Sequence, residues 1–135
     1  MSESFGKHYK LTSKKEISQL FIARNSLRAY PFVVFFNLHT ETASKHQLHF
    51  VVSSPKRLLK KSHDRNRVKR LTREVIRKNK LSLELHCKKN RCDLNLFIIY
   101  NSSVEMPISV MEKKMRQLFN TLSNEIDKKI TSNNV

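Results

Sequence analysis

Three runs of β-branched and aromatic residues predict the strands of a small sheet. Residues 32–40 read Phe-Val-Val-Phe-Phe-Asn-Leu-His-Thr, a composition typical of a strand. Residues 48–53 and 93–100 have the same character. Pro55 ends the second run, because proline cannot continue a strand ladder. Residues 27–30 are a candidate for a shorter strand that leads into the first run.

Apolar residues at helical spacing predict one helix near each end of the chain. Ser13 and Glu16 form a capping box that opens a helix expected at about 14–24. Ser109 and Glu112 form a second capping box, which opens a final helix. One face of that final helix is apolar and carries Met111, Met115, Leu118, Phe119, Leu122 and Ile126.

A third helix is predicted in the middle of the chain, at about 65–80, with Asp64 or Ser62 as its capping residue. Residues 81–90 either prolong this helix or form a short separate one. The order of helix, strands, helix, strand and helix is typical of an α+β protein, in which a small sheet packs on helices.

The size of the chain predicts one domain. It has 135 residues, near the common size for a single core, so residues 1–135 are expected to form one domain with flexible tails at 1–10 and 131–135. The only glycine is Gly6. Rossmann and P-loop phosphate cradles need glycines where the backbone approaches phosphate, so neither can be built here.

The net charge of the chain limits the class of binding partner. The chain carries 27 Lys and Arg against 11 Asp and Glu, a net charge of +16, and such a domain attracts polyanions. An anionic membrane surface is the competing partner, but no lipidation motif, signal-peptide core or membrane-spanning apolar run is visible in the sequence. We therefore expect a cytoplasmic protein that binds nucleic acid.

The positive charge is concentrated in residues 56–80, which hold 12 of the 27 basic residues and only two acids, Asp64 and Glu74. At about 100° per residue the polar side chains gather on one side of the predicted helix: Arg65, Asn66, Lys69, Arg70, Arg73 and Arg77. The other side is apolar and carries Val68, Leu71, Val75 and Ile76. A solvated charged face is the ordinary alternative, yet such faces usually mix both signs. A nearly all-positive face favours a polyanion partner.

This segment resembles the bacterial ribonuclease P protein family, whose signature is an Arg-Asn-Arg run that opens a helix and continues with Lys-Arg and a further Arg. Residues 65–74 read Arg-Asn-Arg-Val-Lys-Arg-Leu-Thr-Arg-Glu. Ser54-Pro55-Lys56-Arg57 stands where the family has a Ser-Lys-Lys loop. Residues 58–64 depart from the glycine and alanine that many members carry there. The strands and the last helix fit the family's remaining elements, and residues 11–21 look like its first helix.

The resemblance implies a four-stranded mixed sheet packed against helices, with the basic helix crossing between strands. It implies that the partner is the catalytic RNA of ribonuclease P, with contacts at Arg65, Asn66, Arg67, Lys69, Arg70 and Arg73. The basic run extends the candidate RNA-binding residues to Lys56, Arg57, Lys60, Lys61 and Arg77. The resemblance also implies a cleft for the single-stranded 5′ leader of precursor tRNA, formed by Ile17, Phe21 and Phe35. Unpaired bases stack on aromatic side chains, although Phe21 and Phe35 can equally be core residues.

The same resemblance implies a non-catalytic subunit of an endoribonuclease that removes tRNA 5′ leaders, with the RNA performing a Mg²⁺-dependent hydrolysis. No acid-base, nucleophile or clustered-carboxylate pattern is visible in the sequence. Cys87 and Cys92 lack two further zinc ligands among suitable neighbours, so free thiols are the better interpretation. Two other hypotheses remain: a general RNA-binding protein, and a protein-only nuclease or DNA-binding module, which the strand content disfavours.

Overall fold

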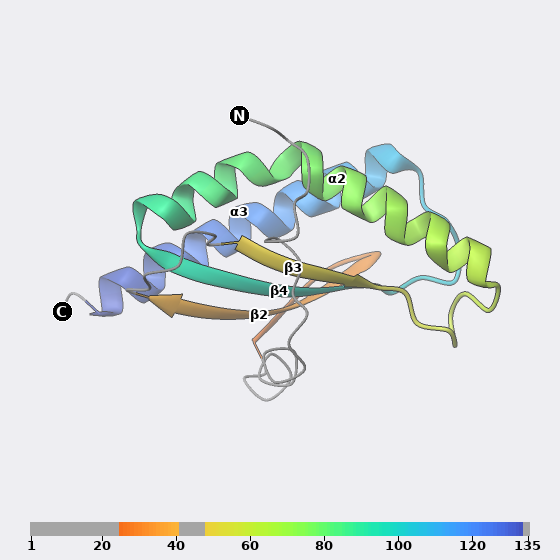
Figure 1. Ribbon diagram of the computed structural model, residues 1–135, viewed down its shortest axis with the longest axis horizontal. Helices are drawn as coiled ribbons and strands as arrows, with labels where there is room; N and C mark the ends of the chain where they lie inside the picture. The colour runs from red at the N-terminus through yellow and green to blue at the C-terminus, as the bar shows by residue number, and fades with distance from the viewer. Residues whose placement is uncertain (1–24, 41–47, 134–135) are drawn as a thin grey trace.

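Four strands and two helices make up the part of the chain that the computed structural model describes, residues 25–40 and 48–133. The elements, in chain order, are β1 (Ser26–Ala29), β2 (Phe32–Thr40), β3 (Leu48–Ser53), α2 (Ser62–Lys89), β4 (Cys92–Tyr100) and α3 (Ile108–Asn133). Both helices lie on the same face of the sheet, so the molecule has two layers (Figure 1). The helix expected at 14–24 lies outside the described residues.

The sheet is mixed, with the strand order β1-β2-β4-β3. β1 pairs antiparallel with β2, and β2 pairs antiparallel with β4. β3 and β4 are parallel neighbours, and such a pair needs a crossover connection, because a tight hairpin can join only antiparallel strands. The basic helix α2 is that crossover. The predicted α+β fold, with a four-stranded mixed sheet and a basic helix between strands, is confirmed.

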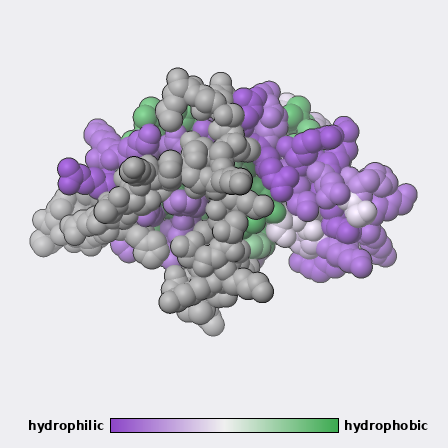
Figure 2. Space-filling model, viewed as in Figure 1, coloured by the Kyte–Doolittle hydropathy of each residue, from purple (hydrophilic) through white to green (hydrophobic). Residues whose placement is uncertain are grey.

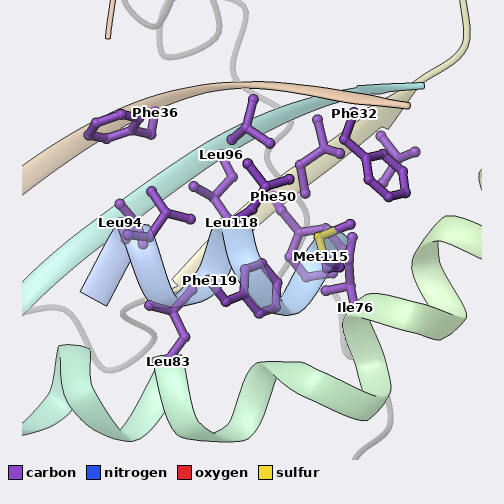
Figure 3. Close-up of a cluster of buried hydrophobic side chains, with 14 of the residues drawn as sticks. Phe32, Phe36, Phe50, Ile76, Leu83, Leu94, Leu96, Met115, Leu118 and Phe119 are labelled. Atoms are coloured by element: carbon purple, nitrogen blue, oxygen red, sulfur yellow. The ribbon is translucent and has the colours of Figure 1, made fainter. Parts of the chain in front are cut away.

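The hydrophobic core lies between the sheet and the two helices. Alternate residues of β2, such as Phe32 and Phe36, point toward the helices, as the two-residue repeat of a strand requires. Figure 3 shows these rings and Leu96 of β4 on the sheet side, with Ile76 of α2 and Phe119 of α3 facing them. Phe32 also meets the Tyr100 ring edge-on, at a centroid distance of 5.9 Å, an arrangement that aromatic pairs favour.

The predicted strands agree closely with the observed ones. β2 and β3 have the predicted bounds, and β1 and β4 each begin one residue earlier than predicted. The central helix is longer than predicted, since α2 begins at Ser62 and runs without interruption to Lys89. Residues 81–89 therefore prolong the basic helix, and a separate helix there is ruled out. Residues 131–133, assigned to a tail from the sequence, form the last part of α3.

The caps predicted for α2 and α3 are wrong, whereas the capping box predicted at Ser13 and Glu16 lies outside the described residues. The N-cap residue of α2 is Lys61, and no side chain caps this end, so neither Ser62 nor Asp64 has that role. α3 starts at Ile108, which places Ser109 inside its first turn. The Pro107 carbonyl accepts hydrogen bonds from two backbone amides of that turn, at 3.0 and 3.1 Å. The amides of Val110 and Met111 therefore bond a backbone carbonyl at the start of α3.

The turn after α2 has an unusual backbone. Arg91, directly after the C-cap residue Asn90, has a φ of 52°. Glycine is the usual residue at this place, because it adopts the left-handed conformation without a steric penalty. The chain has no glycine after Gly6, so an arginine takes the strained position.

Within residues 25–40 and 48–133, no helix combines the length and apolarity that crossing a membrane requires.

Candidate nucleic-acid interface

The first turns of α2 expose a row of polar and cationic side chains. Asn66, Arg67, Arg70 and Arg73 are exposed, whereas Val68 between them is buried in the core. The loop before the helix adds four more exposed cations: Lys56, Arg57, Lys60 and Lys61. Figure 2 shows a mostly hydrophilic surface over the end of the molecule where α2 begins. The predicted division of this helix into a cationic and an apolar side is confirmed.

Arg65 differs from the other arginines of this row because it is partly buried and holds the preceding loop. Its Nη1 donates hydrogen bonds to the backbone carbonyls of Leu59 and Lys60, both at 2.8 Å. Leu59 is itself buried in the core. Arg65 thus fixes the path by which the cationic loop enters α2, a role that the residue pattern did not indicate.

The cationic face ends in the fourth and fifth turns of α2, where Glu74 and Arg77 lie. Arg77 is hydrogen-bonded to Glu74, one turn away, through its Nε at 3.0 Å. This bond, together with the charge of the guanidinium, keeps the pKa of the Glu74 carboxyl below its usual range. Lys78 forms an ion pair with Glu112 of α3 at 3.9 Å. The cations of this part of α2 are therefore paired with acids, and Lys80 is 1% exposed.

Lys69, Arg70 and Arg73 have no ion-pair or hydrogen-bond partner within the described part of the chain. Lys69 is half-buried, whereas the two arginines are exposed. Like charges at this spacing repel one another in the free protein. A bound polyanion relieves that repulsion. The unpaired cations therefore make the start of α2 the part of the helix best suited to bind a polyanion.

The face of the sheet opposite the helices carries an aromatic row. Phe35 of β2 points away from the core and stands directly across from Phe97 of β4, which pairs on its other side with Val51 of β3. All three side chains are half-buried. Phe35 therefore lies outside the core between the sheet and the two helices α2 and α3. The other two predicted cleft residues, Ile17 and Phe21, lie outside the described residues.

Phe97 was missed in the sequence, although a signal for it exists. In β4 the residues Leu94, Leu96 and Ile98 face the core, so the two-residue repeat sends Phe97 and Ile99 to the other face. An apolar aromatic residue on the second face of a central strand is typical of a surface that is covered or used for binding.

Two cysteines lie at the junction of α2 and β4. Cys87 and Cys92 are both free thiols and fully buried, and the Cys92 Sγ donates a weak hydrogen bond to the Cys87 carbonyl at 3.7 Å. The neighbouring Cys92 thiol and burial raise the pKa of Cys87, so this thiol stays protonated and unreactive. The described residues contain no group of three His, Cys, Asp or Glu side chains that could hold a metal ion.

The two-layer α+β fold and the unpaired cations at the start of α2 define a small protein suited to contact a polyanion. A family model described as ribonuclease P matches residues 5–123. The chain therefore belongs to the ribonuclease P family.

Solved structures support the same fold. The chain is similar to the RNase P protein of Staphylococcus aureus, with a TM-score of 0.65 and 15% sequence identity over 84% of this chain and 94% of that one. It is also similar to the RNase P protein of Thermotoga maritima, with a TM-score of 0.62 and 18% identity over 82% and 94% of the two chains. A mutant of the S. aureus protein with defective mRNA degradation activity matches with a TM-score of 0.60 and 15% identity, over 86% and 89%. A search of curated proteins found no match.

Proposed function

We propose that this chain is the protein subunit of ribonuclease P and that it promotes removal of the 5′ leader from precursor tRNA. The start of α2 and the loop before it bind the catalytic RNA. The face of the sheet opposite the helices binds the single-stranded leader. The RNA subunit performs the hydrolysis, and the protein contributes affinity and position.

The observation that carries this proposal is the row of unpaired cations at the start of α2. Arg70 and Arg73 are exposed, and the four loop cations from Lys56 to Lys61 extend the row. Arginine suits this role because its planar fork can bind two phosphate oxygens at once. The proposal assigns phosphate contacts to these side chains.

The aromatic row on the second sheet face supports the leader-binding part. Phe35 and Phe97 are cross-strand neighbours, so their rings are held by two paired central strands. Aromatic side chains on a sheet stack unpaired bases with little sequence preference, because every base has an aromatic face. A leader of variable sequence is a ligand of this kind.

Mg²⁺ enters the reaction through the RNA in this proposal. The side chains at the start of α2 are cationic or neutral, and a divalent cation prefers carboxylate and carbonyl oxygens. These residues do not fit a magnesium site, so no metal ligand is assigned to them. The protein instead screens the repulsion between phosphates, which lowers the Mg²⁺ concentration that the RNAs need to assemble.

The direct test is cleavage of a precursor tRNA by bacterial ribonuclease P RNA at low Mg²⁺, with and without the protein. RNAs from several bacteria are used, so that one mismatched partner does not decide the result. The protein alone and the protein with mature tRNA are the controls. The proposal predicts accurate 5′ cleavage only when RNA and protein are both present.

The main alternative is a general RNA-binding protein, which shares the electrostatics. Such a protein binds precursor and mature tRNA alike and does not restore cleavage by any of the RNAs. That result would reject the subunit role and retain only the polyanion-binding surface. Cleavage by the protein alone would reject the assignment of the chemistry to RNA.

A further inference from the structure

The loop between β4 and α3 is held by its own set of hydrogen bonds. The Tyr100 hydroxyl donates to the Val104 carbonyl at 2.7 Å and accepts from the Met106 amide at 2.8 Å. The Ser102 Oγ accepts from the Val104 amide at 3.2 Å. Tyr100 is fully buried, so its two hydrogen bonds attach the loop of residues 101–107 to the core.

This anchored loop carries Glu105 to the cationic end of α2. The Arg67 Nε donates a hydrogen bond to the Glu105 Oε1 at 2.6 Å. Tyr30, at the turn between β1 and β2, shares a further hydrogen bond of 2.8 Å with Ser102 of the same loop. The backbone on both sides of Glu105 is therefore tied to the strand β4 and to the β1–β2 turn.

The contact uses one of the five N–H donors of the guanidinium. An arginine presents five donors in a rigid fork, and here only the Nε of Arg67 has a partner within residues 25–40 and 48–133. The two Nη groups, which form the bidentate end of the fork, remain available to a phosphate. The side chain is 53% exposed, so this end of the fork lies within reach of a ligand.

We propose that Glu105 is a positioning residue for Arg67: it fixes the guanidinium so that both Nη groups are presented to the RNA backbone. This inference rests on the proposed function. Lys69, Arg70 and Arg73 have no such partner and lose rotamer freedom when they bind. Arg67 is already ordered by Glu105, so it loses less rotamer freedom on binding. For one long side chain, this saving corresponds to about a two- to tenfold gain in affinity.

A carboxylate at an RNA-binding surface also has an opposite effect, because it repels phosphate. Removing an acid that has no positioning role strengthens RNA binding. Removing Glu105 weakens binding if the order of Arg67 matters more than the repulsion. The sign of the change therefore separates the two roles.

The test is a double-mutant cycle on Arg67→Ala and Glu105→Ala, with affinity for ribonuclease P RNA and precursor tRNA measured at fixed salt. We expect Glu105→Ala to weaken binding by about two- to tenfold in the wild-type background. In the Arg67→Ala background the same substitution should strengthen binding slightly. Glu105→Gln keeps an oxygen that accepts from the Arg67 Nε, so it should bind at least as tightly as the wild type.

Two controls separate folding from binding. The Arg67–Glu105 pair is largely exposed, and exposed pairs contribute little stability, so the melting temperature of each variant should stay within about 3 °C of the wild type. Glu125→Ala removes an equal charge from the far end of α3, where the acid pairs only loosely with Lys128 at 3.8 Å. It reports the general effect of losing one negative charge.

The outcomes also distinguish this inference from the function on which it rests. If Glu105→Ala strengthens binding equally in both backgrounds while Arg70→Ala weakens it, Glu105 is a repulsive acid and the positioning role is wrong. If Arg67→Ala has no effect, the positioning role is wrong as well. If neither Arg67→Ala nor Arg70→Ala weakens binding, the proposed RNA contact of α2 fails too.

Discussion

Arg70 is the side chain whose removal isolates phosphate binding most cleanly. It is exposed on α2, and no ion pair or hydrogen bond ties it to the rest of the described chain. Its neighbours on the same face, Lys69 and Arg73, are also cations, so Arg70→Ala relieves repulsion and leaves no buried group unpaired. The free energy of unfolding should change by no more than about 0.5 kcal/mol.

The expected loss of affinity follows from counterion release. Each neutralised phosphate contributes about 0.9 to the log–log slope of affinity against salt for a duplex and about 0.7 for a single strand. If Arg70 meets one phosphate, its removal lowers affinity about four- to sixfold at about 0.15 M salt. At about 0.05 M salt the loss grows to about eight- to fifteenfold, since the same slope acts over a longer interval.

The assay is a binding titration against ribonuclease P RNA at several salt concentrations, for the wild type and for Arg70→Ala. Lys129→Ala is the matched control, because it removes one exposed charge near the opposite end of the molecule. The control should keep the wild-type slope. Parallel lines for wild type and Arg70→Ala would show that Arg70 does not contact phosphate, and a loss of affinity that does not depend on salt would point to a contact with a base or sugar.

Three further substitutions test other parts of the molecule. Phe35→Leu keeps an apolar side chain but removes the ring, so affinity for precursor tRNA should fall about fivefold and affinity for mature tRNA should not; equal losses in gel-shift titrations would contradict leader stacking. Arg65→Ala removes two hydrogen bonds to backbone carbonyls and should cost about 1–3 kcal/mol in urea denaturation, whereas an unchanged midpoint would show that the loop holds itself. Arg91→Gly should raise stability by about 0.5–1 kcal/mol, because glycine relieves the positive φ, and an equal gain from Arg91→Ala would refute this explanation.

The strands could be predicted because many of their residues are of types that favour strands. β2 and β3 are runs of β-branched and aromatic residues, and polar or proline residues interrupt the pattern where they end. The length of α2 could not be predicted in the same way. Its second half buries Lys80 and Glu84, at 1% and 4% exposure, and charged residues in a sequence normally indicate a solvated face.

The helix starts were predicted wrongly for a related reason. Ser62 and Ser109 are good capping residues in isolation. Each helix nevertheless begins at or before the predicted capping residue, and in α3 the carbonyl of Pro107 accepts from the amides of Val110 and Met111. The capping preference of a single residue is therefore weaker than the constraint from the preceding chain, which is β4 and its loop for α3 and the loop after β3 for α2.

The cationic face of α2 was visible in the sequence, but its internal organisation was not. Residue types alone give Arg65, Arg67 and Arg70 the same role. In the fold, Arg65 holds backbone carbonyls, Arg67 meets an acid 38 residues away, and Arg70 has no partner among the described residues. Arg65 contacts the loop before α2, and Arg67 contacts the β4–α3 loop. The periodicity of the sequence records neither contact.

The later turns of α2 offset an energetic cost that the charges of its first turns impose. Cations in the first turns are unfavourable, because the positive end of the helix dipole lies there and the side chains repel one another. No side-chain cap stabilises this end. The later turns offset this cost by packing, since Leu83 and Cys87 are fully buried. A helix that ended at Lys80 would keep the repulsion and lose that packing, so the extension to Lys89 offsets part of the cost of the cationic first turns.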